Sequence, residues 1–206
     1  NEEPCSTPLP TLPPSTSTPT PTPEEPYNRE TLLSTIYSDY SGSDYLNESV
    51  WVANSFDSPF YSGFLSKIEL KLGNPYGLTT GNFEVHLYSS DSNGNVGSSL
   101  IKITEGSISE LEQNENPDST YIIYDLNIEL LPARKYFIVV KGISLDVLDE
   151  FAYFSFPYTE NPIGINSENT LYSYTRNTGE TWSLPYLGNP NLLNVFFDNP
   201  NLPTPE

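Results

Sequence analysis

The stretch KIELKLG, residues 67–73, decides the fold class of this chain. Its apolar residues at 68, 70 and 72 alternate with charged residues at 67, 69 and 71. A period of two places the two sets on opposite faces of an extended strand, so that one face is buried and the other meets solvent. The stretch NFEVHLY, residues 82–88, repeats this pattern and turns its apolar side chains inward, namely Phe83, Val85 and Leu87.

Further stretches are rich in aromatic and β-branched residues, which favour strands. They are TLLSTIY (31–37), SVWVANSF (49–56), SLIKIT (99–104), TYIIYDL (120–126), KYFIVVKG (135–142), FAYFSF (151–156), TLYSYT (170–175) and LLNVFF (192–197). Clusters of Gly, Asn, Asp and Pro lie between them and favour turns. SISELEQ (107–113) fits a short helical turn, and no stretch has a long helical period. We predict an all-β fold over residues 27–206: an antiparallel β-sandwich, jelly-roll-like.

Residues 1–26 differ in composition from the rest of the chain. Nine prolines, six threonines and three serines make up 18 of these 26 residues. Such a segment favours the extended polyproline II conformation and is typical of O-glycan carriers. We therefore predict an extended Pro/Thr-rich arm with glycans at Ser15, Thr16, Ser17, Thr18, Thr20 and Thr22. The single cysteine, Cys5, also lies here, as a free thiol or in a disulfide to another chain.

The charge balance limits the partners of the chain. There are 27 acidic and 8 basic residues, for a net charge of −19. Nucleic acids and anionic membrane surfaces require basic patches, so neither is an expected partner. No apolar run approaches the ~20 residues of a membrane helix. The chain holds no methionine, and we expect a secreted, extracellular protein from which a leader has been removed.

Several segments resemble the choice-of-anchor R family. They are WVANSF (51–56), LSKIELKLGN (65–74), GNFEVHLYSSDSNGNVGSSL (81–100), YFIVVKG (136–142) and GETW (179–182). This family comprises secreted bacterial β-sandwich domains that are attached to the cell surface by varying anchors. The resemblance implies the same fold and location and brings no catalytic residues. Taken as a whole, the chain resembles a subunit of the glycosylated extracellular fibrils and pili of aquatic bacteria.

Catalytic residue patterns are scarce, and we do not expect an enzyme. His86 is the one histidine, and it falls on the polar face of its strand, where we expect an exposed side chain rather than a hydrolase triad. There is no Cys/His cluster for zinc. Three clustered acids, Asp146, Asp149 and Glu150, are the candidates for glycoside hydrolysis. Acids this abundant are usually solvated surface, so this is the weaker interpretation.

One cation site is suggested by DSNGN, residues 91–95. Asp91, Asn93 and Asn95 stand at alternate positions, as in the first half of a calcium loop. The glycine is misplaced and no glutamate follows at the twelfth position, so a hairpin turn explains the stretch better. Calcium is the one candidate cofactor besides covalent glycans. Asn47, in the sequon Asn47-Glu48-Ser49, is an additional candidate for glycosylation.

Two tryptophans and two tyrosines are candidates for sugar binding. Trp51, Trp182, Tyr172 and Tyr174 would form a stacking platform if their rings lay exposed and coplanar. Tryptophans in a sandwich more often fill the core, and we expect both Trp51 and Trp182 to do so.

The arm needs another surface to become ordered. In TPTPTP (18–23), an extended backbone turns every threonine N–H to one flank and leaves the other flank, that of the prolines, without donors. The arm then pairs along one flank as a strand, or it lies in a groove as polyproline II. Four apolar side chains are expected to take part in this contact between subunits: Leu9, Leu12, Leu33 and Tyr37.

The reach of the arm favours a neighbouring subunit. At ~3.1 Å per residue the 26 residues extend ~80 Å, whereas a domain of this size is ~40 Å across. We expect a homopolymer in which each arm docks on the next sandwich, head to tail, as a structural filament with a role in adhesion or biofilms. The alternative is a monomeric cell-surface domain that binds polysaccharide, with the arm as a glycosylated stalk.

Overall fold

The computed structural model describes residues 28–145, 153–187 and 189–199, and all of its paired strands are antiparallel. The strands are β1 (Asn28–Ser34), β2 (Gly42–Leu46), β3 (Trp51–Asp57), β4 (Gly63–Leu70), β5 (Asn82–Ser90), β6 (Val96–Ser107), β7 (Tyr121–Ile123), β8 (Ile128–Leu130), β9 (Lys135–Ile143), β10 (Phe154–Tyr158), β11 (Leu171–Thr175), β12 (Tyr186–Leu187) and β13 (Leu193–Asn199). Two short 3-10 helices, η1 (Ile108–Glu110) and η2 (Ser167–Asn169), lie between strands.

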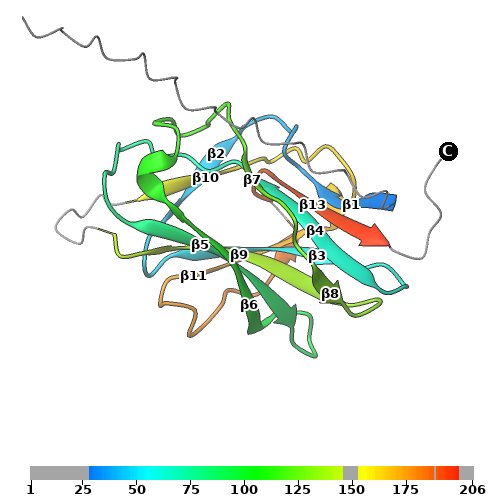
Figure 1. Ribbon diagram of the computed structural model, residues 1–206. Coiled ribbons are helices and arrows are strands. Elements are labelled where there is room, and N and C mark those ends of the chain that lie inside the picture. Colours follow the sequence, from blue (N-terminus) through cyan, green and yellow to red (C-terminus); the bar gives the residue numbers. More distant parts are fainter. Residues whose placement is uncertain (1–27, 146–152, 188, 200–206) are drawn as a thin grey trace, which may run out of the picture.

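The strands form two large sheets and one small one (Figure 1). One large sheet has the order β1-β13-β4-β7. Strand β7 pairs with Ile68–Leu70 of β4, and β8 pairs with the other end of β4, at Gly63–Leu65. The other has the order β12-β11-β3-β9-β5-β6, and β10 pairs with β2 to make the small sheet. The predicted all-β antiparallel sandwich is therefore confirmed.

The core lies between the two large sheets and follows the period of two. Ile68, Leu70 and Leu72 are buried together, as the first stretch predicted. The inward set of β5 (Phe83, Val85, Leu87) belongs to the same cluster. Rings from several strands fill the rest, among them Phe154, Phe156 and Phe197. Burial of each large apolar side chain stabilises the fold by about 2 kcal/mol.

A second apolar cluster lies on the outer face of the six-stranded sheet. Its buried members are Ala53, Val96, Phe137 and Val139. Trp51, Tyr88 and Trp182 pack over them from the solvent side. Strand β9 is therefore buried on both faces, which explains why its sequence is one continuous apolar run rather than an alternation.

A buried polar network fixes the segment that leads into β13. Asn191 is fully buried, and its Nδ2 donates to Asp44 Oδ2 and to the carbonyl of Phe156, each at 2.9 Å. Its Oδ1 accepts from Asn54 Nδ2 at 2.8 Å. Asp44 also accepts from Tyr172 Oη at 2.9 Å. Because buried polar groups need partners, this network links four separate strands at the sandwich interior.

The predicted strand boundaries need correction, most of all for β1, β6 and β7. The strand predicted over residues 99–104 is twice as long and runs from Val96 to Ser107 as β6. Strand β1 begins at Asn28 and ends at Ser34, so the TLLSTIY strand is shifted toward the N-terminus. Beyond Ser34, the Thr35 hydroxyl donates to the carbonyl of Asn191 at 2.6 Å and accepts from the N–H of Leu193 at 2.9 Å, and a turn follows at residues 36–37. Strand β7 stops at Ile123, shortly before Asp125, whose φ of 53° is left-handed and ends the extended run. The short helical turn was placed correctly, at η1.

Candidate functional site

The side of β6 that faces away from β5, here called the β6 edge, is the longest open strand edge in the described part of the chain. Strand β6 has 12 residues and pairs with β5 alone. Two apolar side chains near its middle, Leu100 and Ile101, are 53% and 44% exposed. An open edge presents a row of unpaired N–H and C=O groups, and such a row binds an added strand.

The register of β6 against β5 is interrupted three times, between Val85 and His86, between Leu87 and Tyr88, and between Tyr88 and Ser90. At each interruption the pairing advances one residue further along β6 than along β5, so β6 carries the extra residue. Bulges on an edge strand restrict long, regular pairing with another chain. The uninterrupted run is short, from Thr104 to Ser107, so the β6 edge suits a short added strand better than a long one.

The β6 edge and β1 lie on opposite sides of the sandwich. At one side, the Tyr121 ring of β7 packs against Phe83 of β5 at 5.0 Å, and its Oη lies next to Gly106 of β6. Since β1 and β7 are at opposite ends of their sheet, β1 lies away from β6. A 140 Å³ hollow is lined by Leu32 of β1 and Phe56 of β3 among others, which is consistent with this placement.

The outer edge of β1, unlike that of β6, is partly covered. The Ser34 N–H donates to the carbonyl of Ile165 at 3.0 Å. The side chain of Asn166 donates to the carbonyl of Leu32 at 2.8 Å. These bonds occupy the end of β1, the strand that follows the arm. The outer edge of β1 is therefore less available to an added strand than the β6 edge.

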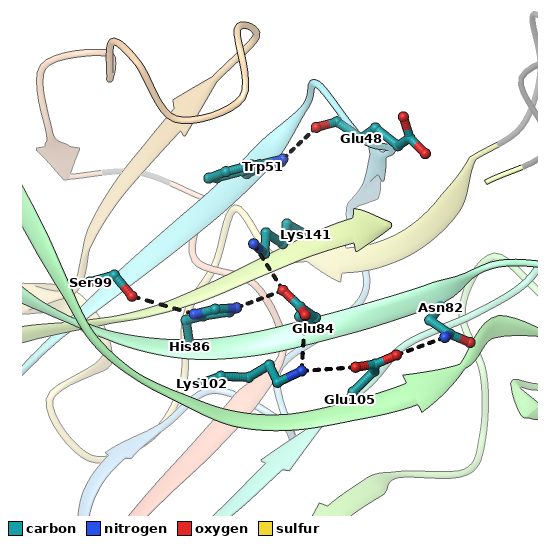
Figure 2. A network of polar contacts seen from close by, with 9 residues as sticks. All are labelled: Glu48, Trp51, Asn82, Glu84, His86, Ser99, Lys102, Glu105 and Lys141. Carbon is teal, nitrogen blue, oxygen red and sulfur yellow. Dashed lines mark hydrogen bonds and ion pairs between the residues drawn. The ribbon is translucent and has the colours of Figure 1, made fainter. Parts of the chain in front are cut away.

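Beside the β6 edge, the outer face of the sheet carries a cluster of charges, here called the Glu84 network (Figure 2). Glu84 of β5 receives Lys141 of β9 at 2.9 Å, His86 at 2.8 Å and Lys102 of β6 at 3.2 Å. Lys102 also contacts Glu105 at 2.9 Å. Burial acts to raise the pKa of Glu84, but the hydrogen bonds from the two lysines and His86 outweigh it and lower the pKa to about 2.

His86 is buried, at 9% exposed, and the expectation of an exposed histidine was wrong. Neighbours cover it: Nε2 contacts Glu84 Oε2, Nδ1 lies 3.4 Å from Ser99 Oγ, and the ring meets the Tyr88 ring edge-on at 6.2 Å. Burial lowers the pKa of His86 below its ordinary value. Serine, histidine and carboxylate stand in contact, but the carboxylate is shared with two lysines and neither hollow described in this section includes these residues.

The four aromatic candidates do not form a platform. Trp51 and Trp182 lie together on the outer face, 6.4 Å apart and tilted by 62°, so their rings are not coplanar. Tyr172 and Tyr174 pack against the sandwich core on the inner face instead. The tryptophans are half-buried over the second apolar cluster, so the expectation that they fill the sandwich core needs correction. Lys141 Nζ lies 4.7 Å above the Trp51 ring.

The calcium candidate residues form the predicted hairpin turn between β5 and β6. Asp91 Oδ1 accepts from the N–H groups of Asn93 and Asn95, each at 2.8 Å. Asp91 Oδ2 accepts from Asn95 Nδ2 at 3.0 Å. Because Asn95 presents a donor to the carboxylate and both carboxylate oxygens already cap the turn, the residues act together as a turn rather than as converging oxygen ligands.

Two of the predicted intersubunit residues lie in the described region. Leu33 is 1% exposed and belongs to the core of its own domain, so the expectation that it contacts a neighbour needs correction. Tyr37 is 83% exposed and borders a 240 Å³ hollow that Glu69 and Lys71 also line. Asn47 lies in the turn between β2 and β3, where its Oδ1 accepts from the N–H groups of Ser49 and Val50.

The remaining candidates lie outside the described residues. They are Cys5, Leu9, Leu12, Ser15, Thr16, Ser17, Thr18, Thr20 and Thr22 in the arm and Asp146, Asp149 and Glu150 in the 146–152 segment. The β6 edge itself was not anticipated from the sequence. The composition of SLIKIT predicts a strand, but its mixture of apolar residues with Lys102 does not indicate which strands flank it.

Comparison with known proteins gives distant matches. No protein-family model matches the chain, and no curated protein matches it. One similar solved structure holds the cysteine protease and lectin-like domains of Cwp84, a surface-layer-associated protein of Clostridium difficile; it has 10% identity and a TM-score of 0.49, over 74% of this chain and 33% of that chain. Another is that of infectious bursal disease virus, Gt strain, with 9% identity and a TM-score of 0.34, over 92% of this chain and 47% of that chain.

The chain spans less than half the length of either similar structure. At these identities and scores neither likeness supports an argument about activity, ligand or partner. Within the described ranges, no helix has both the length and the apolar character needed to cross a membrane.

Proposed function

We propose that the chain is a structural subunit of an extracellular filament, in which the arm of each copy docks on the sandwich of the next. The role of such a filament is adhesion or biofilm formation, and the threonines and serines of the arm carry glycans. The partner is therefore an identical subunit.

The observation that carries the proposal is the position of β1 relative to the β6 edge. The arm leads into β1 at one side of the sandwich, and the longest open edge of the described strands lies at the other. When the arm of one copy binds the β6 edge of the next, two different surfaces meet, and the contact is heterologous. A heterologous contact repeats from copy to copy instead of closing a twofold dimer.

Charge supports docking through the arm rather than through the faces of the domain. The chain has a net charge of −19, so two copies repel each other when their surfaces approach. Residues 4–23 contain no charged side chain. This neutral part of the arm approaches an acidic neighbour without that electrostatic cost.

Electron microscopy of the full chain and of a chain that begins at Tyr27 tests the proposal. The full chain is expected to form filaments, and the shortened chain is expected to stay monomeric with the same thermal unfolding. Filaments from both chains would refute a role for the arm. Monomers from both would favour the alternative, a monomeric surface domain that binds polysaccharide.

A further inference from the structure

We infer that residues 18–23 of one copy bind the β6 edge of another copy as an added strand. The inference rests on the proposed role as a polymer subunit and names the two surfaces that meet.

The donor segment is suited to pair on one flank only. In an extended backbone, the N–H and C=O of each residue point to the same flank, and successive residues alternate. Thr18, Thr20 and Thr22 therefore present complete donor and acceptor pairs to one flank. The prolines at 19, 21 and 23 present carbonyls alone to the other, because proline has no N–H.

The acceptor suits a short added strand. Its regular run, Thr104–Ser107, turns the N–H and C=O of two alternate residues to the open flank, which is enough to pair with two of the three threonines. Exposed Leu100 and Ile101 add apolar contact area for proline and threonine methyl groups. Once the segment is bound, its proline flank forms the new edge of the sheet, and that edge lacks the donors for a further strand.

Charge at the β6 edge is also compatible with this donor. Lys102 is the one basic residue of β6, and Glu84 and Glu105 already neutralise it, at 3.2 and 2.9 Å. The edge therefore offers no free cation to attract an acidic strand. An uncharged segment such as 18–23 has neither attraction nor repulsion to overcome there, so backbone hydrogen bonds decide the contact.

Reach assigns the donor to a second copy. The six Cα-to-Cα steps from Thr22 to Asn28 span at most about 20 Å. From β1, a path around the molecule crosses the sheet to β7, descends to the other sheet and passes beyond β6. With strand spacings of about 4.8 Å and a sheet separation of about 10 Å, this path is about 30 Å. Thr22 and Pro23 therefore do not reach the β6 edge of their own domain, so the three threonines cannot all pair there.

Two matched full-length variants test the strand pairing. Thr18→Pro/Thr20→Pro/Thr22→Pro removes the donors of the pairing flank, and Thr18→Val/Thr20→Val/Thr22→Val keeps them while removing the hydroxyls. Electron microscopy and sedimentation should show filaments from the valine variant and monomers from the proline variant. Filaments from both variants overturn the inference. Monomers from both also overturn it, because the hydroxyls or their glycans would then make the contact.

Hydrogen–deuterium exchange of the assembled, unaltered chain locates the acceptor. Amides of Val96–Ser107 should exchange more than about tenfold more slowly in filaments than in the monomeric proline variant, while amides of Asn28–Ser34 should not change. Filaments with unchanged β6 exchange would overturn this inference and leave the proposed function standing. If the unaltered chain forms no filaments, the proposed function fails, and the inference fails with it.

Discussion

Lys141 of β9 places its Nζ 2.9 Å from Oε2 of Glu84 on the neighbouring strand β5. The same ammonium group lies 4.7 Å above the ring of Trp51. The contact therefore joins the Glu84 network to the aromatic residues that cover the outer face of the sheet. It ties three adjacent strands together on the solvent side and makes the stability of this face depend on the ionisation of one carboxylate.

Acid should destabilise the domain through Glu84. The pKa of Glu84 is lowered from its ordinary 4.5 to about 2 in the folded chain. Its contribution to stability is therefore complete above pH 4.5 and is lost as the pH falls from 4.5 toward 2. Glu84→Gln should flatten the decline of Tm in this range, as measured by circular dichroism. Exposed Glu129→Gln is the control, and an unchanged decline in Glu84→Gln would contradict the account.

His86 should add an acid-sensitive step at higher pH. Burial lowers its pKa below the ordinary 6.5, so the unfolded chain binds the proton more readily and stability is lost as the pH falls below 6.5. His86→Gln should remove the part of the decline in Tm that begins near pH 6.5. A decline that persists in that variant would assign it to another group.

Trp182 should stabilise the domain from outside the sandwich. Trp182→Ala uncovers part of the second apolar cluster and removes ring contacts with Trp51 and Tyr88, at 6.4 and 6.2 Å. Because the ring is half-buried, we expect a loss of about 2 kcal/mol in the free energy of unfolding, measured with urea. Leu184, in the same loop, is 79% exposed, and Leu184→Ala should cost less than about 0.5 kcal/mol. Equal losses would mean that the outer cluster does not depend on Trp182.

Asn191→Ala should be more damaging than its small change in volume implies. The substitution removes the side-chain bonds of Asn191 to Asp44 and Asn54, so that Tyr172 alone remains as the network partner of Asp44. Unpaired buried polar groups cost free energy, and we expect a loss of about 3 kcal/mol on urea unfolding. Exposed Asn161→Ala is the matched control. A loss no greater than in the control would show that water or a rearrangement replaces these bonds.

Calcium should leave the hairpin turn unchanged. Asp91 already accepts three hydrogen bonds within the turn, and these bonds, with Asn95 first, lower the pKa of its carboxyl. Millimolar calcium chloride should therefore not shift Tm relative to a chelator, whereas Asp91→Ala should lower Tm in both solutions. A rise of Tm with calcium that Asp91→Ala abolishes would restore the calcium site.

Local alternation was sufficient to predict the buried face of β4 and β5, because the period of two is a property of neighbouring residues. It was insufficient for β2, whose sequence GSDYL carries little apolar pattern and becomes a strand by pairing with β10. The short strands β8 and β12 were missed for the same reason. Pairing partners lie far apart in the sequence, and no short stretch encodes them.

The candidate site shows the same limit. The sequence placed Glu84 and His86 on the outer face, but it did not indicate that Lys141, Lys102 and Ser99 would surround them, since these come from two other strands. The sequence also did not identify β6 as an edge strand. An edge strand has a paired strand on one side only, and the sequence of the strand itself does not reveal this. Tyr172 was grouped with Trp51, although pairing of β11 with β3 places its side chain on the inner face.

A mixing experiment tests head-to-tail docking of the arm most directly. A chain that begins at Tyr27 keeps the sandwich that receives an arm but has none to donate, so its incorporation should stop growth at one end. When it is mixed with the full chain, the mean filament length in electron micrographs should fall steadily as its fraction rises. Filament lengths that do not depend on this fraction, while the shortened chain is incorporated along them, would contradict the account.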